Sequence, residues 1–392
     1  MAKRAGHSLM KSIGFDLRAL QYGFKAHKNR GIGVYTDNVI RRRHLAPEGL
    51  LIAPFYDPYY ESEEPLKLNA RPFDPGWARK FQPFIKDYIW SHFFYKNIVD
   101  STVKRAGVEA IFFPSHLDTP AGLKVPYCVT VHDLISVALK DHYSRSVKRK
   151  AHVKTQLATL KGARLILADS EHTKHDVVRF AHVNPSKVTV VYLGVDPEFK
   201  PEVSNSRERL DLPEKFILYV GGIDWRKNIS LLFKAFSGLL KKRPDYHLVM
   251  TGEIENDPSY QNFLQSLKER SLESKVHTLG FVSRADLVKL YNHAAVFFYP
   301  SVYEGFGLPV LEAMACGAPV ITTNRTSIPE VAGDAALSLD PDDPESFIEA
   351  LIRVVESDSE RKKLSCAGLA RAAMFSWDKC AKLTYEALMS AG

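Results

Sequence analysis

Short apolar runs alternate with longer amphipathic segments throughout the second half of the chain. The short runs predict strands, and the longer segments, in which apolar residues recur three and four positions apart, predict helices. Expected strands lie at 216–220, 247–251, 276–279, 294–299 and 319–323, and expected helices at 230–240, 259–271, 284–293 and 308–316. Such alternation indicates a parallel sheet with helices on both faces, which is a doubly wound α/β domain.

The first half repeats this pattern less regularly. Strands are expected at 12–16, 51–55, 110–113, 127–131, 165–168 and 188–191, with a helix at 33–44. Segment 57–83 is rich in proline, tyrosine and charge and predicts a long loop. Segment 81–98 has apolar residues at helical spacing, which indicates a helix that faces either the core or a lipid surface.

The length of 392 residues indicates more than one domain, because a single hydrophobic core rarely grows to this size. Asp196-Pro197 and the polar run 202–209 predict a linker. We therefore expect one Rossmann-like domain over residues 1–200 and a second over 201–375. A last helix is expected at 377–389.

Two glutamates, Glu304 and Glu312, lie on either side of the start of the helix expected at 308–316. A glycine loop that opens onto a helix directs backbone N–H groups at a polar ligand, here the amides of Phe306, Gly307 and Leu308. The helix is otherwise apolar or small, so a buried Glu312 needs a polar partner, which sugar or ribose hydroxyls would supply. The alternative is that Glu312 caps a neighbouring amide or pairs with a core arginine.

Glycines and basic residues follow the strand expected at 216–220. Gly221 and Gly222 permit close approach of the backbone, and Arg226 and Lys227 precede the next helix. A fixed Arg–Lys pair can neutralise a departing diphosphate without a metal. The alternative is a pair of solvated cations in a turn, but the carboxyl end of a strand favours ligand binding.

The first half carries two further candidate sites. Gly31 and Gly33 open the first helix and superficially match a dinucleotide fingerprint, but Thr36 replaces the last glycine, which argues against NAD binding. His132 follows the strand at 127–131, where it would bind a sugar hydroxyl, assist proton movement or bond only to local backbone. The polar run 169–173 indicates capping of a helix.

Composition and spacing argue against several other classes of site. No apolar run approaches the ~20 residues needed to cross a bilayer, and the N-terminus lacks the apolar segment of a secretory signal. The cysteines lack zinc spacing and suit a reducing, cytoplasmic compartment. Asp340-Pro341-Asp342 matches a D-x-D metal motif, but Asp343-Pro344-Glu345 directly after it indicates helix capping, so no metal site is expected.

The net charge of +8 suits anionic partners. Basic residues cluster at 41–43 and 145–154, where they form either solvated helix faces or a peripheral contact with the inner face of the plasma membrane. Nucleic acid is not expected as a partner, because proteins that bind it usually show a stronger basic excess.

The spacing of Glu304 and Glu312 resembles the E-x7-E signature of the retaining glycosyltransferases of family 4, which have the GT-B fold. That fold consists of two Rossmann-like domains that face each other across a cleft. The R-G-I-G sequence at 30–33, followed by Tyr-Thr, is similar to that of bacterial mannosyltransferases of surface-polysaccharide synthesis. The resemblance implies an acceptor-side domain at 1–200, a donor-binding domain at 201–375 and a C-terminal helix at 376–392 that packs back onto the first domain.

The resemblance also implies roles for the residues. Glu304 and His132 are the implied catalytic residues, Glu312 would bind ribose, and Arg226 with Lys227 would hold the diphosphate. The other implied donor-binding residues are Gly31, Gly33, Gly221, Gly222, Val282, Ser283, Phe306, Gly307 and Leu308. Many family members carry an arginine where this chain has Gly222, and Arg226 would take over its role.

The implied enzyme is a metal-independent hexosyltransferase without a cofactor, which uses a nucleotide diphosphate sugar and a glycan or lipid-linked acceptor. The R-G-I-G sequence favours GDP-mannose as the donor. Two alternatives are a transferase for UDP-linked glucose, N-acetylglucosamine or galactose, and a nucleotide-sugar epimerase on the same scaffold.

Overall fold

The computed structural model describes residues 10–22, 24–25, 31–60, 67–74, 95–143, 147–202 and 212–391. The chain forms two compact units, one of residues 1–194 with 377–392 and the other of residues 195–376. Each unit contains one parallel sheet, so the two doubly wound α/β domains expected from the alternating pattern are confirmed.

The first unit holds a seven-stranded sheet in the order β3-β2-β1-β4-β5-β6-β7. Its strands are β1 (Lys11–Asp16), β2 (Leu50–Tyr56), β3 (Arg71–Pro72), β4 (Ala110–Phe113), β5 (Tyr127–Val131), β6 (Leu165–Ala168) and β7 (Val188–Val190). The helices around it are α1 (Gly31–Arg41), α4 (Tyr95–Ala106), α5 (Ile135–Ala138), α6 (Lys140–Tyr143), α7 (Val147–Gly162), α8 (Glu171–Ala181) and α16 (Trp377–Ser390).

The last helix, α16, belongs to this unit although it follows the second unit in the sequence. The hydroxyl of Tyr385 donates to the carbonyl of Val39 at 2.7 Å, and Lys11 Nζ donates to the carbonyl of Leu388 at 2.9 Å. These bonds join α16 to α1 and to the first strand, so residues from both ends of the chain form one core.

The second unit holds a six-stranded sheet in the order β10-β9-β8-β11-β12-β13. Its strands are β8 (Phe216–Val220), β9 (His247–Thr251), β10 (Val276–Thr278), β11 (Val296–Tyr299), β12 (Val320–Thr323) and β13 (Leu337–Leu339). Its helices are α9 (Ile229–Leu240), α10 (Tyr260–Glu269), α11 (Arg284–His293), α12 (Leu308–Ala315), α13 (Ile328–Ala332), α14 (Pro344–Glu356) and α15 (Asp358–Ala372).

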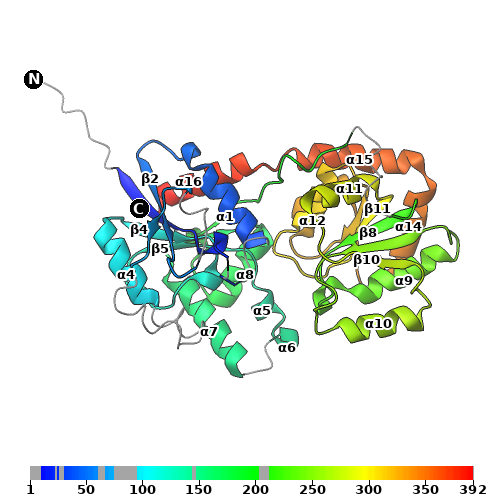
Figure 1. The fold of residues 1–392 in the computed structure, drawn as a ribbon, viewed down its shortest axis with the longest axis horizontal. Helices are drawn as coiled ribbons and strands as arrows, with labels where there is room; N and C mark the ends of the chain where they lie inside the picture. Colours follow the sequence, from blue (N-terminus) through cyan, green and yellow to red (C-terminus); the bar gives the residue numbers. More distant parts are fainter. Residues whose placement is uncertain are drawn as a thin grey trace, which may run out of the picture. The chain divides into compact units, whose positions relative to one another are not determined.

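Helices cover both faces of the second sheet (Figure 1). Helix α9 packs against α10 and α14, while α12 packs against α11 and α15. The strand order reverses between β8 and β11, which are adjacent in the sheet but separated in sequence by two strands. In sheets of this kind, ligands bind beyond the carboxyl ends of the strands at the point of reversal.

Two predictions about local structure need correction, and a third falls mostly on residues that the structure does not describe. The loop expected at 57–83 contains the short strand β3, whose residues are exposed and lack an apolar pattern. The first helix begins at Gly31 rather than 33 and ends at Arg41, after which Arg43–Leu45 forms a separate turn of 3-10 helix. Most of segment 81–98 lies outside the described residues, and helix α4 begins at Tyr95.

The basic clusters are only partly described. Arg41 pairs with Asp37 at 2.6 Å and Arg42 with Asp378 at 2.5 Å, so both serve as internal ion pairs of the first unit. The side chains of residues 143–149 lie outside the described part of the structure. Among the helices that are described, none has the length and apolar character needed to span a bilayer.

Candidate functional site

The loops after β8 and β11 meet at the point where the strand order of the second sheet reverses. Parallel pairing of Val296 with Ile217 and of Phe297 with Leu218 brings the carboxyl ends of both strands to the same edge. The amide of Val302 then donates to the carbonyl of Arg226 at 2.8 Å, which joins the two loops directly. Side chains that follow β8 and β11 are therefore neighbours despite their separation in sequence.

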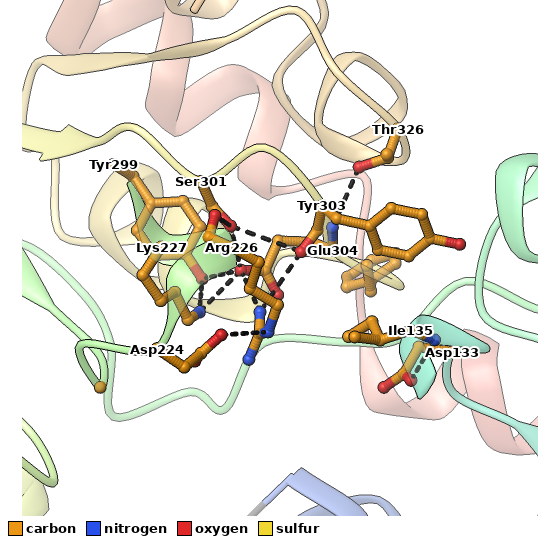
Figure 2. Close-up of polar contacts among 12 residues, drawn as sticks. Asp133, Ile135, Asp224, Arg226, Lys227, Tyr299, Ser301, Tyr303, Glu304 and Thr326 are labelled. Atoms are coloured by element: carbon orange, nitrogen blue, oxygen red, sulfur yellow. Dashed lines mark hydrogen bonds and ion pairs between the residues drawn. The ribbon is translucent and has the colours of Figure 1, made fainter. Parts of the chain in front are cut away.

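The Glu304 carboxylate is the centre of the resulting polar cluster (Figure 2). Its Oε1 atom accepts hydrogen bonds from Lys227 Nζ at 2.6 Å and from Arg226 Nη1 at 2.7 Å. The same atom accepts from the hydroxyls of Tyr299 at 2.8 Å and Ser301 at 2.6 Å. All hydrogen bonds of this carboxylate to described residues use Oε1. The structure thus brings together Glu304, Arg226 and Lys227, the three charged residues singled out in the two loops.

The electrostatics of this cluster favour the ionised carboxylate. Burial by itself would raise the pKa of Glu304, but the charges of Lys227 and Arg226 outweigh it and hold that pKa at about 2. Lys227 is 6% exposed and Glu304 is 9% exposed, so both charges are largely removed from water. Burial lowers the pKa of Lys227, and Glu304 opposes that effect. At neutral pH Glu304 accepts hydrogen bonds and has no proton to donate.

The glycines of the two loops allow the backbone to turn at the site. Gly307 has φ +106, and a Cβ atom there would lie 2.8 Å from Ile328 Cδ1, so a larger residue would meet both backbone strain and a clash. Gly307 is also the residue at which α12 starts, with Leu308 as its first member. The Phe306 side chain is buried against Phe375, so only its backbone can face a ligand.

Glu312, on α12, is half-buried rather than fully buried as expected. Its Oε2 atom accepts a hydrogen bond from the Tyr291 hydroxyl of α11 at 3.1 Å. Burial raises the pKa of Glu312 to about 7, while Tyr291 and Arg284 act in the opposite direction. Arg284 itself pairs with Asp196 and Glu198. The partner of Glu312 is therefore a tyrosine and not a core arginine.

Replacing Glu312 with glutamine is expected to raise the free energy of unfolding at pH 8 by about 1–2 kcal/mol, roughly half the full linkage because the side chain is half-buried. The folded-state pKa of about 7 exceeds the ~4.3 of an unfolded glutamate. Wild-type stability is therefore fully present at pH 4 and falls as the pH rises through 7. Glutamine does not ionise, so the variant lacks this loss.

Urea unfolding at pH 4, 6 and 8 measures the difference between variant and wild type. The exposed Glu345 of α14, replaced by glutamine, serves as the control for removal of a carboxylate. A difference between Glu312→Gln and the wild type that stays constant from pH 4 to pH 8 would contradict the expected linkage.

A row of aromatic rings connects the two glutamates within the second unit. Tyr219 stacks on Tyr299 with ring centroids 6.4 Å apart, Tyr299 on Phe297 at 5.7 Å, and Phe297 meets Tyr291 edge-on at 5.3 Å. The tyrosines at 299 and 291 each donate a hydroxyl to one glutamate. The sequence analysis did not identify Tyr299 or Tyr291 as site residues. Alternation along β11 does place residues 297 and 299 on one face of the sheet.

The loop after β10 holds Val282 and Ser283 at the start of α11. Ser283 caps this helix, since its Oγ accepts from the amide of Asp286 at 3.1 Å and donates to the Asp286 carboxylate at 2.7 Å. The carbonyl of Gly280 accepts from the amide of Gly252 and the hydroxyl of Thr251, which fixes the loop to the end of β9. Val282, which is half-buried, and Ser283, which is exposed, thus lie at the same strand edge as the loop after β8.

His132 lies in the first unit, directly after β5. Its Nδ1 is 2.6 Å from Asp169 Oδ2 and its Nε2 is 2.9 Å from the carbonyl of Pro114. Burial lowers the pKa of His132, but the Asp169 carboxylate outweighs it and raises that pKa overall. Because both partners are acceptors, the doubly protonated imidazolium satisfies them both. Both ring nitrogens are therefore occupied by groups of the first unit.

The polar run after β6 was assigned to helix capping, which Ser170 confirms. Ser170 caps α8 by accepting from the amide of Thr173 at 3.0 Å. Asp169 instead binds His132, a contact that joins the ends of the adjacent strands β5 and β6. Nothing in the local sequence distinguishes the two roles.

The remaining candidates are divided between the two units. Gly31 and Gly33 form the first turn of α1 in the first unit, and a Cβ atom at Gly31 would contact no other atom within 4 Å. Asp343 caps α14 as predicted. Asp340 and Asp342 of the D-x-D sequence both pair with Arg325 at 2.8 Å.

Models of two glycosyltransferase families match most of the chain. A model described as Glycosyltransferase Family 4 matches residues 31–199, and one described as Glycosyl transferases group 1 matches residues 202–371. O-antigen chain mannosyltransferase B of Escherichia coli is 35% identical over 66% of this chain and 68% of its own length. Serotype-specific mannosyltransferase WbdA of E. coli is 31% identical over 70% of this chain, which spans only 35% of that relative.

Solved structures show the same fold at low sequence identity. Sucrose-phosphate synthase of Thermosynechococcus elongatus has a TM-score of 0.73 and 20% identity, with 97% of this chain and 100% of that chain covered. WaaG, a glycosyltransferase involved in lipopolysaccharide biosynthesis, has a TM-score of 0.69 and 17% identity, with 95% and 98% covered. The chain therefore belongs to the family 4 glycosyltransferases and has the GT-B fold, which confirms the resemblance inferred from the E-x7-E spacing.

Proposed function

We propose that this protein transfers a hexose, with mannose favoured, from a nucleotide diphosphate sugar to a hydroxyl of a glycan or lipid-linked acceptor, with retention of the anomeric configuration. The observation that carries the proposal is the cluster of Glu304, Arg226 and Lys227 at the strand reversal of the second unit. Two relatives from E. coli, both mannosyltransferases, support mannose as the sugar.

Arg226 and Lys227 are suited to hold the donor diphosphate. Two cations share one Glu304 carboxylate, and Arg226 has a second acidic neighbour in Asp224 at 3.3 Å. A diphosphate brings more negative charge than one carboxylate and would compete well for the same N–H donors. As the bond from the sugar to the phosphate breaks, these fixed cations stabilise the charge on the leaving group without a metal.

Glu304 is suited to bind the sugar rather than to transfer a proton. Its low pKa leaves it ionised at neutral pH, so it accepts hydrogen bonds from sugar hydroxyls. The reaction then proceeds by attack from the face that the diphosphate leaves. The C1–O bond to phosphate breaks, the bond from C1 to the acceptor oxygen forms, and a phosphate oxygen takes the acceptor proton.

Glu312 and the loop after β10 are suited to the nucleoside. With its pKa at about 7, Glu312 can accept from a ribose hydroxyl when ionised and donate to it when protonated. Backbone groups at Val282 and Ser283 would meet the edge of the base, and the amides of Phe306, Gly307 and Leu308 would meet the sugar. We assign Gly221 and Gly222 to close backbone approach to the donor.

The first unit supplies the groups assigned to the acceptor side. His132 lies between two acceptors, the Asp169 carboxylate and the carbonyl of Pro114, and its pKa is raised, which favours a fixed positive charge over a shuttled proton. We propose that this charge stabilises the transition state, and that Gly31 and Gly33 present the first turn of α1 to the donor phosphates. Peripheral contact with an anionic membrane through the basic residues of the sequence 145–154 is also part of the proposal.

A thermal-shift screen of nucleotide sugars tests the donor assignment. GDP-mannose at 100 times its Kd is expected to stabilise the protein by about 2.7 kcal/mol, which raises Tm by several degrees, with UDP-glucose, UDP-N-acetylglucosamine and UDP-galactose well below it. Incubation of the same donors without acceptor tests for epimerisation. Transfer to an acceptor with and without EDTA tests for metal dependence. Selective stabilisation by a UDP-sugar, or conversion of the donor sugar without acceptor, would contradict the proposal.

A further inference from the structure

The backbone of the loop that carries Glu304 is held by hydroxyl groups from the neighbouring strand. Regular pairing between β11 and β12 ends with Tyr299 opposite Thr322. Beyond that point, side chains of residues 322–327 take over the contacts. We call this set the hydroxyl clamp, and its described members are Thr322, Thr323, Thr326 and Ser327.

The hydroxyl clamp makes five hydrogen bonds to residues 299–306. Its donor bonds run from Thr322 to the Tyr299 carbonyl at 2.8 Å, from Thr323 to the Ser301 carbonyl at 2.6 Å, and from Ser327 to the carbonyls of Glu304 at 2.8 Å and Phe306 at 3.1 Å. Thr326 alone acts as an acceptor. Its Oγ1 receives the Glu304 amide at 3.0 Å, as Figure 2 shows.

Thr326 adopts a backbone conformation that its side chain disfavours. Its φ is +54, in the left-handed region that glycine enters freely and that β-branched residues rarely occupy. A residue kept in such a conformation costs free energy, and residues of this kind cluster at functional sites. Glycine would remove the strain but would also remove the acceptor for the Glu304 amide.

The backbone of Glu304 is consequently held by hydrogen bonds on both sides of its Cα atom. Thr326 holds its N–H, and the fully buried Ser327 holds its C=O. The carboxylate of the same residue is fixed by Lys227 and Arg226. A donor hydroxyl bound by this carboxylate would therefore meet a preorganised acceptor.

We propose that Thr326 is a positioning residue for sugar transfer, which holds the Glu304 backbone where its carboxylate can bind the donor sugar. The inference rests on the proposed role of Glu304. It goes beyond that role because it assigns the strained threonine, and not only the glutamate and its cations, to the reaction. The strain at Thr326 is then the cost of placing an acceptor opposite the Glu304 amide.

Three replacements of Thr326 separate strain from positioning. Thr326→Ser keeps the hydroxyl and is expected to retain kcat/KM within about threefold of the wild type. Thr326→Val keeps the shape and loses the acceptor, while Thr326→Gly loses both strain and acceptor. Both are expected to lower kcat/KM by about ten- to a hundredfold, as small displacements of reacting groups do. Thr326→Gly should nevertheless have an unchanged or higher Tm, since glycine relieves the strain.

Ser271 provides a matched control. It is an exposed residue after α10 with φ +52, so it shares the left-handed conformation but lies away from the site. Ser271→Gly should relieve strain in the same way and leave kcat/KM unchanged. A loss of activity confined to the Thr326 variants would therefore come from displacement of Glu304 and not from relief of backbone strain.

Hydrogen exchange at the Glu304 amide supplies a readout that needs no donor. The amide should be protected in the wild type and in Thr326→Ser, and should exchange faster in Thr326→Val and Thr326→Gly. A wrong donor assignment would leave the wild type inactive with GDP-mannose without altering this result. Wild-type kcat/KM in Thr326→Val or Thr326→Gly with the donor that the wild type accepts, or equal protection of the amide in all variants, would overturn the inference.

Discussion

Glu304→Gln is expected to lower kcat/KM for sugar transfer on the order of 10²- to 10³-fold, the range found when one preorganised electrostatic group is removed from an active site. Glutamine keeps the volume of the side chain but replaces the charge that faces Arg226 and Lys227. The variant can neither orient sugar hydroxyls as an ionised carboxylate does nor hold the two cations in place. Initial rates at saturating acceptor and varied donor measure the change.

The same substitution is expected to destabilise the fold. Breaking a buried ion pair by removing one partner costs ~3–5 kcal/mol, because the remaining charge is left in a dry environment. The wild-type carboxylate, with its pKa lowered to about 2, contributes stability that is present above ~4.3 and is lost as the pH falls toward 2. Thermal unfolding should therefore show a lower Tm for Glu304→Gln at pH 7 and a smaller difference near pH 3.

Glu345→Gln is the control for Glu304→Gln, because Glu345 is exposed and 3.5 Å from an exposed lysine. Exposed pairs contribute about 0–1 kcal/mol, so its Tm and activity should stay near the wild type. A folded Glu304→Gln protein that transfers sugar at the wild-type rate would refute the assignment of Glu304.

Lys227→Met is expected to lower kcat/KM on the order of 10²-fold or more, since it removes one of the two cations assigned to the leaving diphosphate. Methionine matches the apolar part of lysine and suits the buried position. Glu304 keeps Arg226 as a partner at 2.7 Å, so the loss of stability should be smaller than in Glu304→Gln. The fall should appear in kcat as well as in KM, because the charge on the leaving group develops in the transition state.

Lys234→Met is the matched control for Lys227→Met. Lys234 lies on the helix that follows, is half exposed and pairs only weakly with Glu345. Its replacement removes the same charge from the same unit and should leave kcat/KM unchanged. Equal effects of Lys227→Met and Lys234→Met would point to net charge rather than to a bound diphosphate and would contradict the proposed role.

Most strands, and the helices α9 to α12 of the second unit, could be predicted because their signals are local. The strand Phe216–Val220 and the helix Arg284–His293 have the predicted bounds, since apolar runs, caps and glycines mark their ends. The short strands β3 and β13 were missed because Arg71–Pro72 is exposed and Leu337–Leu339 has no residue that is fully buried. Neither carries the apolar pattern on which the prediction depended.

The charged members of the site could be predicted, but their mutual contacts could not. Lys227 and Glu304 are 77 positions apart and meet only because β8 and β11 are adjacent in the sheet. The contact of His132 with Asp169 likewise depends on the order of β5 and β6. Strand order is set by packing of the whole unit, so no local motif reveals it.

The role of Thr326 could not be predicted from the sequence, for a different reason. Its importance follows from a backbone angle and from one bond to the Glu304 amide. A threonine in a loop gives no sign of either in the sequence. The glycines at 221 and 307 were predictable because their residue type itself indicates an unusual backbone conformation.

The row of rings from Tyr299 through Phe297 to Tyr291 has a consequence for engineering donor preference. These rings contact both Glu304 and Glu312. The parts of a donor that the two glutamates recognise are therefore not independent of each other. Transplanting only the loop 300–307 from a relative with another preference would leave the recipient's own β11 and α11 beneath it. A successful chimera should exchange residues 284–327 as one block.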